Sequence, residues 1–121
     1  EIGEYISALS NSAALFRQAS GFLVWGIEDD THKTVGTTFK PKSGKAHNQD
    51  LENWLANNAH PRIDFRFHEG DFEGEPVVVL EIPAAQHTPV RFLDAEFIRV
   101  NSAKRKLKDF PEKERALWAL F

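Results

Sequence analysis

The segment from Gly21 to Asp30 constrains the fold of this chain more than any other, because an apolar run leads directly into three consecutive carboxylates. The run from Phe22 to Ile27 is apolar-rich and short, and this pattern predicts a strand that is covered on both faces. The acidic residues 28–30 predict either a solvated turn into the next strand or a place for chemistry at the strand's end. A second extended segment near Thr34 to Thr38 would complete a hairpin.

The overall composition predicts one soluble globular domain. The chain has 121 residues, of which 41% are hydrophobic and 27% charged, which is enough apolar material for a core but too little for two domains. No apolar run approaches the roughly 18 residues that span a bilayer, so we expect no membrane partner. With no cysteine, disulfides, thiolate zinc sites and a cysteine nucleophile are excluded, and a cytoplasmic location is expected.

The chain contains no methionine and begins at Glu1. We therefore interpret residues 1–121 as a single domain from a longer protein.

Apolar residues at helical spacing predict two helices in the first half of the chain, one at its start and one around Leu51 and Leu55. Tyr5, Ile6 and Leu9 recur at helical intervals, and the polar pair after them, residues 11–12, predicts that this helix ends there. A second helix is predicted from the stripe that includes Leu51 and Leu55, with Asn48 as its cap and Pro61 ending it.

The second half of the chain is mostly extended. Residues 63–67 alternate between apolar and polar side chains, and we expect them to pair antiparallel with residues 77–82. Residues 90–93 and 96–100 give two more extended segments, and a helix follows Phe110. This order favours an α+β fold in two layers, with a mostly antiparallel mixed sheet and helices packed on one side.

Three common kinds of catalytic or nucleotide site find no support. Ser43-Gly44-Lys45 is followed by alanine, and its spacing from Gly36 is wrong for a phosphate-binding loop of the Walker type. The histidines are scattered and form no zinc-binding pair. No Gly-x-Ser-x-Gly motif is present, so nucleophilic hydrolysis by serine is not indicated.

The acidic turn allows a metal-dependent alternative. Glu28 and Asp29 stand at the end of a strand, where carboxylates can hold Mg²⁺ or Mn²⁺ for phosphodiester cleavage. Such sites take ligands from several elements, and the sequence does not place Glu81 or Glu96 beside them. We expect no cofactor, with Mg²⁺ or Mn²⁺ as the alternative.

The basic residues near the C-terminus favour a polyanionic partner. The net charge is -3, yet the segment from Arg99 to Lys108 carries several basic side chains and no acidic one. Lysine and arginine clustered after a strand suit phosphates, and Phe92 or Phe97 would offer a stacking face. The alternative is a solvated charge run before a helix. The predicted phosphate-facing group is Arg99, Lys104, Arg105, Lys106 and Lys108, with Arg91 extending it if its strand lies alongside.

One set of segments is notable for its order along the chain: Ile6 to Asn11, Gly21 to Asp29, Val35-Gly36, Pro61 to Ile63, Val77 to Pro83, Pro89-Val90 and Phe97 to Val100. Taken together, these segments resemble the schlafen AlbA-type domain, which is described as DNA-binding. The resemblance implies the front module of a bacterial transcriptional regulator or RecG-related helicase-like protein. Some relatives are RNA endonucleases with three metal-binding carboxylates, and Asp29 resembles one of them.

The sequence therefore predicts a nucleic-acid-binding module whose partner is DNA or RNA. Phosphate contacts of this kind position a protein without reading bases. Two alternatives remain, a metal-dependent nuclease domain that is incomplete here and a module for protein interaction or homodimerisation. The second would use an exposed strand edge or the face formed by Trp118, Leu120 and Phe121.

Overall fold

The computed structural model describes residues 1–46 and 49–121. Its three α-helices are α1 (Ile2–Leu15), α2 (Leu51–Asn58) and α3 (Pro111–Trp118), and two 3-10 turns span Pro41–Ser43 and Leu107–Asp109. None of these helices is long and apolar enough to cross a membrane. Asn48, the predicted cap of α2, lies outside the described residues, and Asp50 takes the cap position without a side-chain hydrogen bond.

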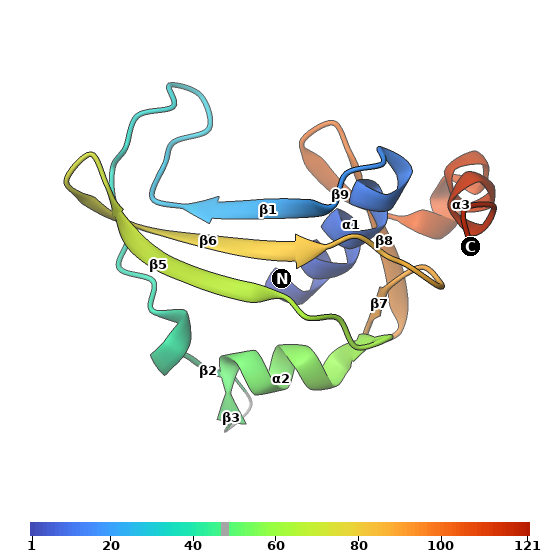
Figure 1. Ribbon diagram of the computed structural model, residues 1–121, viewed down its shortest axis with the longest axis horizontal. Coiled ribbons are helices and arrows are strands. Elements are labelled where there is room, and N and C mark those ends of the chain that lie inside the picture. The colour runs from blue at the N-terminus through green and yellow to red at the C-terminus, as the bar shows by residue number, and fades with distance from the viewer. Residues whose placement is uncertain (47–48) are drawn as a thin grey trace.

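The described strands form two main sheets and a small two-stranded one, β2-β3, and all their pairs are antiparallel (Figure 1). The three-stranded sheet has the order β1-β6-β5, and the four-stranded sheet has the order β4-β7-β8-β9. The strand bounds are β1 Ser20–Trp25, β2 Lys45–Ala46, β3 Gln49–Asp50, β4 Ala59–His60, β5 Arg66–Phe72, β6 Glu75–Pro83, β7 Arg91–Phe92, β8 Ala95–Val100 and β9 Ala103–Lys106. The predicted α+β class is confirmed, although the strands form separate sheets instead of one.

Helix α1 holds the two sheets together through polar side chains that are buried. Asn11 is fully buried; its Nδ2 donates to the carbonyls of Val90 and Phe97 at 3.0 and 2.8 Å, and its Oδ1 accepts from the Val90 amide at 2.7 Å. Ser7 and Ser12 bond the backbone of β8 and the residue before β7, while Ser10 donates to the Pro83 carbonyl at the end of β6.

This bonding explains why the predicted end of the first helix is wrong. Asn and Ser side chains usually favour helix ends because they bond their own backbone. Here Asn11 and Ser12 bond the backbone of distant strands, so α1 continues to Leu15. Buried polar atoms on this helix are satisfied, as such groups must be in a core.

The prediction that the strand after Gly21 is covered on both faces is also wrong. Leu23 and Trp25 pack into the core, and an added Cβ on Gly21 would approach the Leu9 Cβ to 3.1 Å, which shows how closely α1 covers that face. On the opposite face, the exposed fraction is 54% for Phe22 and 42% for Val24. Helix α1 covers one face of β1, and no described element covers the other.

The hairpin predicted after β1 is reduced to a turn. Ile27 and Thr34 form an isolated bridge, and residues 34–38 are not a strand. The Gly26 carbonyl accepts from the amides of Val35 and Gly36 at 2.8 and 3.0 Å, and both glycines have positive φ, 103° and 79°. These left-handed conformations bend the chain away from the sheet. The predicted pairing of residues 63–67 with 77–82 occurs as β5 with β6, although β5 begins only at Arg66. The two extended segments predicted at 90–93 and 96–100 contain β7 and β8, which pair antiparallel with each other.

Candidate nucleic-acid interface

The β8–β9 hairpin carries most of the predicted phosphate-binding residues and sends them to different sides. Its register pairs Arg99 with Lys104, Ile98 with Arg105 and Phe97 with Lys106. Because directly paired residues share a face of the sheet and successive residues alternate, Arg105 points away from Lys104 and Lys106. Ile98 packs in a small core with Leu107 and Leu117, so Arg105 lies on the side of the sheet that α3 covers and is itself exposed.

Lys104 is held by helix α1 instead of facing solvent freely. Its Nζ lies 3.0 Å from a Glu4 carboxylate oxygen and 3.9 Å from one of Glu1, and it sits 5.3 Å from the centre of the Tyr5 ring. The hydrogen bond with Glu4 raises the pKa of Lys104 above its ordinary value. Its charge is therefore compensated inside the domain, although it shares a face of the hairpin with Arg99 and Lys106.

Three of the predicted cations line the same hollow. Arg91, Lys106 and Lys108 line one open hollow of about 410 Å³ beside β7 and β8. Within the described part of the chain, none of the three has an ion pair within 4.0 Å. We call this place the basic hollow; its remaining lining residues are Asp94, Ala95 and Glu96.

Glu96, an acid that lines the same hollow, has a raised pKa. Burial and, secondarily, the nearby Glu114 raise the pKa of Glu96, while Arg91 acts in the opposite direction. A raised pKa means that Glu96 gives up its negative charge more readily than a free glutamate as the pH falls. The hollow therefore becomes more positive on acidification, which favours an anionic ligand.

Arg99 lies elsewhere, in a groove along the edge of β1. Its Nε donates to the Asn101 carbonyl at 3.0 Å, and its side chain helps to line two hollows of about 640 and 410 Å³. The two hollows also share Leu9 and Phe22, so we treat them as one feature and call it the β1 groove. Arg99 is thus separated from the cations of the basic hollow.

The predicted stacking residues are buried, and other aromatic residues are exposed in their place. Phe92 and Phe97 have exposed fractions of 3% and 8%, so neither presents a ring to a ligand. Phe16 and Phe22, which the sequence reasoning did not select, are 68% and 54% exposed and line the β1 groove near Arg99. The alternation of β1 was the available signal, since Gly21 facing the helix requires Phe22 to face outward.

The acidic turn does not complete a metal site with the residues that the structure describes. Glu28, Asp29 and Asp30 line the far end of the β1 groove together with His32. Yet among residues 1–46 and 49–121 no three His, Cys, Asp or Glu side chains converge as metal ligands. Catalytic metal sites draw on convergent ligands from several elements. The residues present therefore do not fit Mg²⁺ or Mn²⁺, and no cleavage step follows from them.

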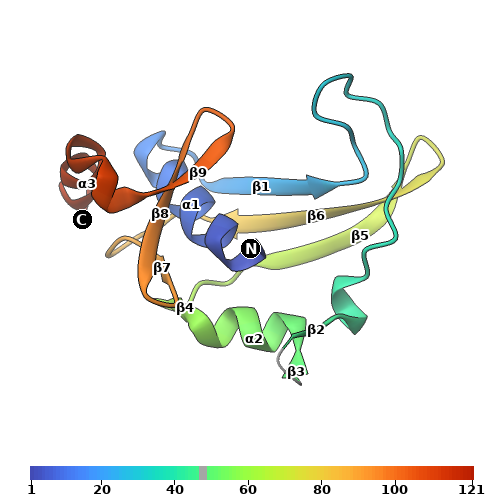
Figure 2. The same ribbon diagram turned by 180° about the vertical axis from the view of Figure 1, so that it is seen from behind.

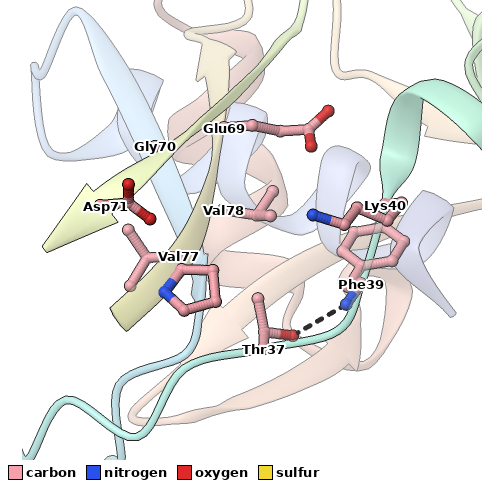
Figure 3. A pocket seen from close by; sticks show the side chains of 9 residues that line it. Thr37, Phe39, Lys40, Glu69, Gly70, Asp71, Val77 and Val78 are labelled. Carbon is pink, nitrogen blue, oxygen red and sulfur yellow. Dashed lines mark hydrogen bonds between the residues drawn. The ribbon is translucent and has the colours of Figure 1, made fainter. Parts of the chain in front are cut away.

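A third hollow, of about 240 Å³, lies between the segment after the acidic turn and the β5–β6 hairpin. Figure 3 shows Glu69 and Asp71 from β5 on one side of it and Lys40 and Phe39 on the other, with the Phe39 amide donating to Thr37 Oγ1 at 3.2 Å. Two acids with a single lysine disfavour a polyanion here. Of the hollows described, the basic hollow has the most favourable charge for phosphate.

Comparison with known proteins gives one family and one fold. The family described as Schlafen, AlbA_2 matches residues 1–108. No curated protein matches this chain. The crystal structure of the DIP2311 protein from Corynebacterium diphtheriae is similar, with a TM-score of 0.51 and 21% sequence identity over 95% of this chain. The chain covers 19% of the length of that protein, and at this identity the likeness concerns the fold.

Proposed function

The chain belongs to the Schlafen AlbA_2 family, and on this basis we propose that it is a nucleic-acid-binding domain that holds the phosphate backbone of DNA or RNA. The basic hollow is the observation that carries the proposal. Arg91, Lys106 and Lys108 line it together with two acids, Asp94 and Glu96, and have no ion-pair partner among the described residues, on a molecule whose net charge is -3. Such a local excess of positive charge attracts a polyanion despite the overall sign.

The three cations favour backbone contact over base recognition. Lysine is a flexible point charge, and arginine can donate to two phosphate oxygens at once. The described lining of the hollow contains no aromatic residue, and the two predicted stacking rings are buried, so it offers phosphate contacts and no ring on which a base could stack. Contacts of this type set the position of a protein on nucleic acid and carry no sequence information. Sequence specificity would require another domain.

The wider setting of the domain is also part of the proposal. The chain corresponds in fold to 19% of a much longer bacterial protein, which supports a module within a larger polypeptide. We propose a cytoplasmic transcriptional regulator or RecG-related helicase-like protein, in which this domain supplies nonspecific affinity. A partner domain would then supply sequence recognition or motor activity.

The decisive experiment is a salt titration. Fluorescently labelled single- and double-stranded DNA and RNA are bound at several salt concentrations, and the affinity is plotted against salt on logarithmic axes. Each lost phosphate contact should flatten the slope by roughly one unit. Replacing Lys106 and Lys108 together (K106Q/K108Q) should therefore weaken binding and flatten the slope by about two units.

A matched control removes the same charge elsewhere. Lys33 and Lys40 are exposed and lie away from the basic hollow, near the acidic turn and in the third hollow. The K33Q/K40Q variant has the same net charge as K106Q/K108Q, and its affinity and slope should stay close to those of the original chain. Equal losses in both variants would mean that net charge alone matters, and an unchanged K106Q/K108Q would show that the assigned surface is wrong.

A further inference from the structure

Among the residues that the structure describes, the backbone groups along one edge of β1 have no strand partner. The Ala84 amide donates to the Ala19 carbonyl at 3.0 Å, next to the register pair Ser20–Pro83. In an antiparallel pair the bonded positions alternate, so the odd-numbered residues of β1 bond β6. The amides and carbonyls of Ser20, Phe22 and Val24 consequently point away from β6, and no backbone bond of Phe22 or Val24 to a third element occurs within the described residues.

The free edge opens into the β1 groove, which is shaped for a single extended chain. The acidic turn and the β8–β9 hairpin rise beyond the same edge of β1 at its two ends, as both views show (Figures 1 and 2). Residues from both projections line the 640 Å³ hollow, and Tyr5 and Leu9 of α1 form an apolar wall. A second copy of the sheet would bring two projections of its own against these, whereas one strand fits between them.

The charges along the groove differ at its two ends. Glu28, Asp29 and Asp30 stand at the end where β1 finishes, while Arg99 lies toward its beginning, where the exposed Arg17 follows α1. Acids outnumber the arginine in the larger hollow, which disfavours the uniform negative charge of a nucleic-acid strand. A chain that is positive at one end and negative at the other matches both ends.

We propose that the β1 groove binds an extended peptide, which adds as a strand antiparallel to β1 with its cationic N-terminal end against Glu28–Asp30 and its carboxylate end toward Arg99. Strand addition of this kind takes its affinity from main-chain hydrogen bonds along an open edge. The antiparallel direction follows from the charges, because the parallel one would put like charges together at both ends. With β1 spanning Ser20–Trp25, about six peptide residues, or roughly 20 Å, fill the site.

The test uses the peptide Lys-Val-Thr-Val-Thr-Val with free termini as the probe. Its isomer Val-Thr-Val-Thr-Val-Lys has the same composition and charge but places the lysine at the Arg99 end, so it should bind several-fold more weakly. Titration of the ¹⁵N-labelled 121-residue chain should give saturable shifts at the Ser20, Phe22 and Val24 amides and slow their hydrogen exchange. Unchanged amides at millimolar probe, or shifts confined to other surfaces, would overturn the proposal.

Two further comparisons separate strand addition from other kinds of contact. The probe is N-methylated at alternate residues in two versions, one at odd and one at even positions. Only the version that blocks the amides facing β1 should lose binding, because the other set points to solvent. Equal loss, or no loss, in both versions contradicts a strand register.

The same probe is also titrated against variants of the protein. D29N/D30N should weaken the probe several-fold, while Asp71→Asn, which removes an exposed acid from β5, should not. K106Q/K108Q should leave peptide binding unchanged, so failure here and failure of the nucleic-acid proposal are distinguishable. If a 15-residue oligo-dT displaces the probe from the Phe22 and Val24 amides, the groove is a nucleic-acid site and the peptide proposal is wrong.

Discussion

Replacing Asn11 with alanine tests whether one buried amide holds α1 against β8. The substitution removes the bonds to the Val90 amide, the Val90 carbonyl and the Phe97 carbonyl. The Val90 carbonyl keeps its bond from Ser7, so two buried backbone groups lose their partner. At about 1–3 kcal/mol for each orphaned group, the free energy of unfolding should fall by about 2–6 kcal/mol.

This loss is large for a domain of this size, whose total stability is roughly 5–15 kcal/mol. Urea unfolding followed by tryptophan fluorescence measures it directly, with the dependence on denaturant (the m-value) checked for a two-state transition. Ser10→Ala removes a single hydrogen bond, to the Pro83 carbonyl, and should cost less. A loss below about 1 kcal/mol for Asn11→Ala, at an unchanged m-value, would refute the assigned role.

Two further predictions concern charge. Lys104→Gln should change nucleic-acid affinity less than K106Q/K108Q does, because Glu4 already compensates Lys104; an equal or larger loss in the salt titration would contradict this. Glu96→Gln should strengthen nucleic-acid binding at neutral pH, because it removes a negative charge from the basic hollow. It should also flatten the pH dependence of binding, because the pKa of the native glutamate is raised above the ordinary value of 4.5 and its charge is lost as the pH falls toward that value. For folding, a raised pKa favours the protonated native state, so stability should decline as the pH rises through the raised pKa, and urea unfolding of Glu96→Gln should lack this decline.

Local patterns in the sequence were sufficient for most elements but not for their surroundings. Apolar spacing predicted α1 and α2, because helical periodicity depends on near neighbours in the chain. Which face of β1 is covered depends on where α1 docks, so the exposure of Phe22 was not predictable from the run of apolar residues alone. The polar side chain of Asn11 predicted a helix end, and that prediction was wrong because its partners, Val90 before β7 and Phe97 in β8, lie far along the chain.

For the candidate site, too, the sequence shows which residues are neighbours in the chain but not how they lie in space. The basic residues predicted to face phosphate are mostly neighbours in the sequence, but the pairing of β8 with β9 and their contact with α1 distribute them in space. Lys104 meets Glu4 across almost the whole length of the sequence, and no local pattern reports such a contact. Arg91 was expected to extend the basic group only if its strand lay alongside. Its strand β7 does pair with β8, and Arg91 lines the same hollow as Lys106.

Helix α1 explains why one small domain presents two surfaces of different charge. The edge of β8 that lies beyond its short pairing with β7 is bonded by Ser7, Asn11 and Ser12, so a helix does there what a neighbouring strand would do. Because α1 occupies that position, β9 pairs on the other edge, and the hairpin lines the basic hollow with Glu96 and Lys106 and the β1 groove with Arg99 and Ser102. Both proposed sites therefore depend on this docking. Asn11→Ala should weaken phosphate binding and peptide binding together, whereas K106Q/K108Q and D29N/D30N should each affect one of them.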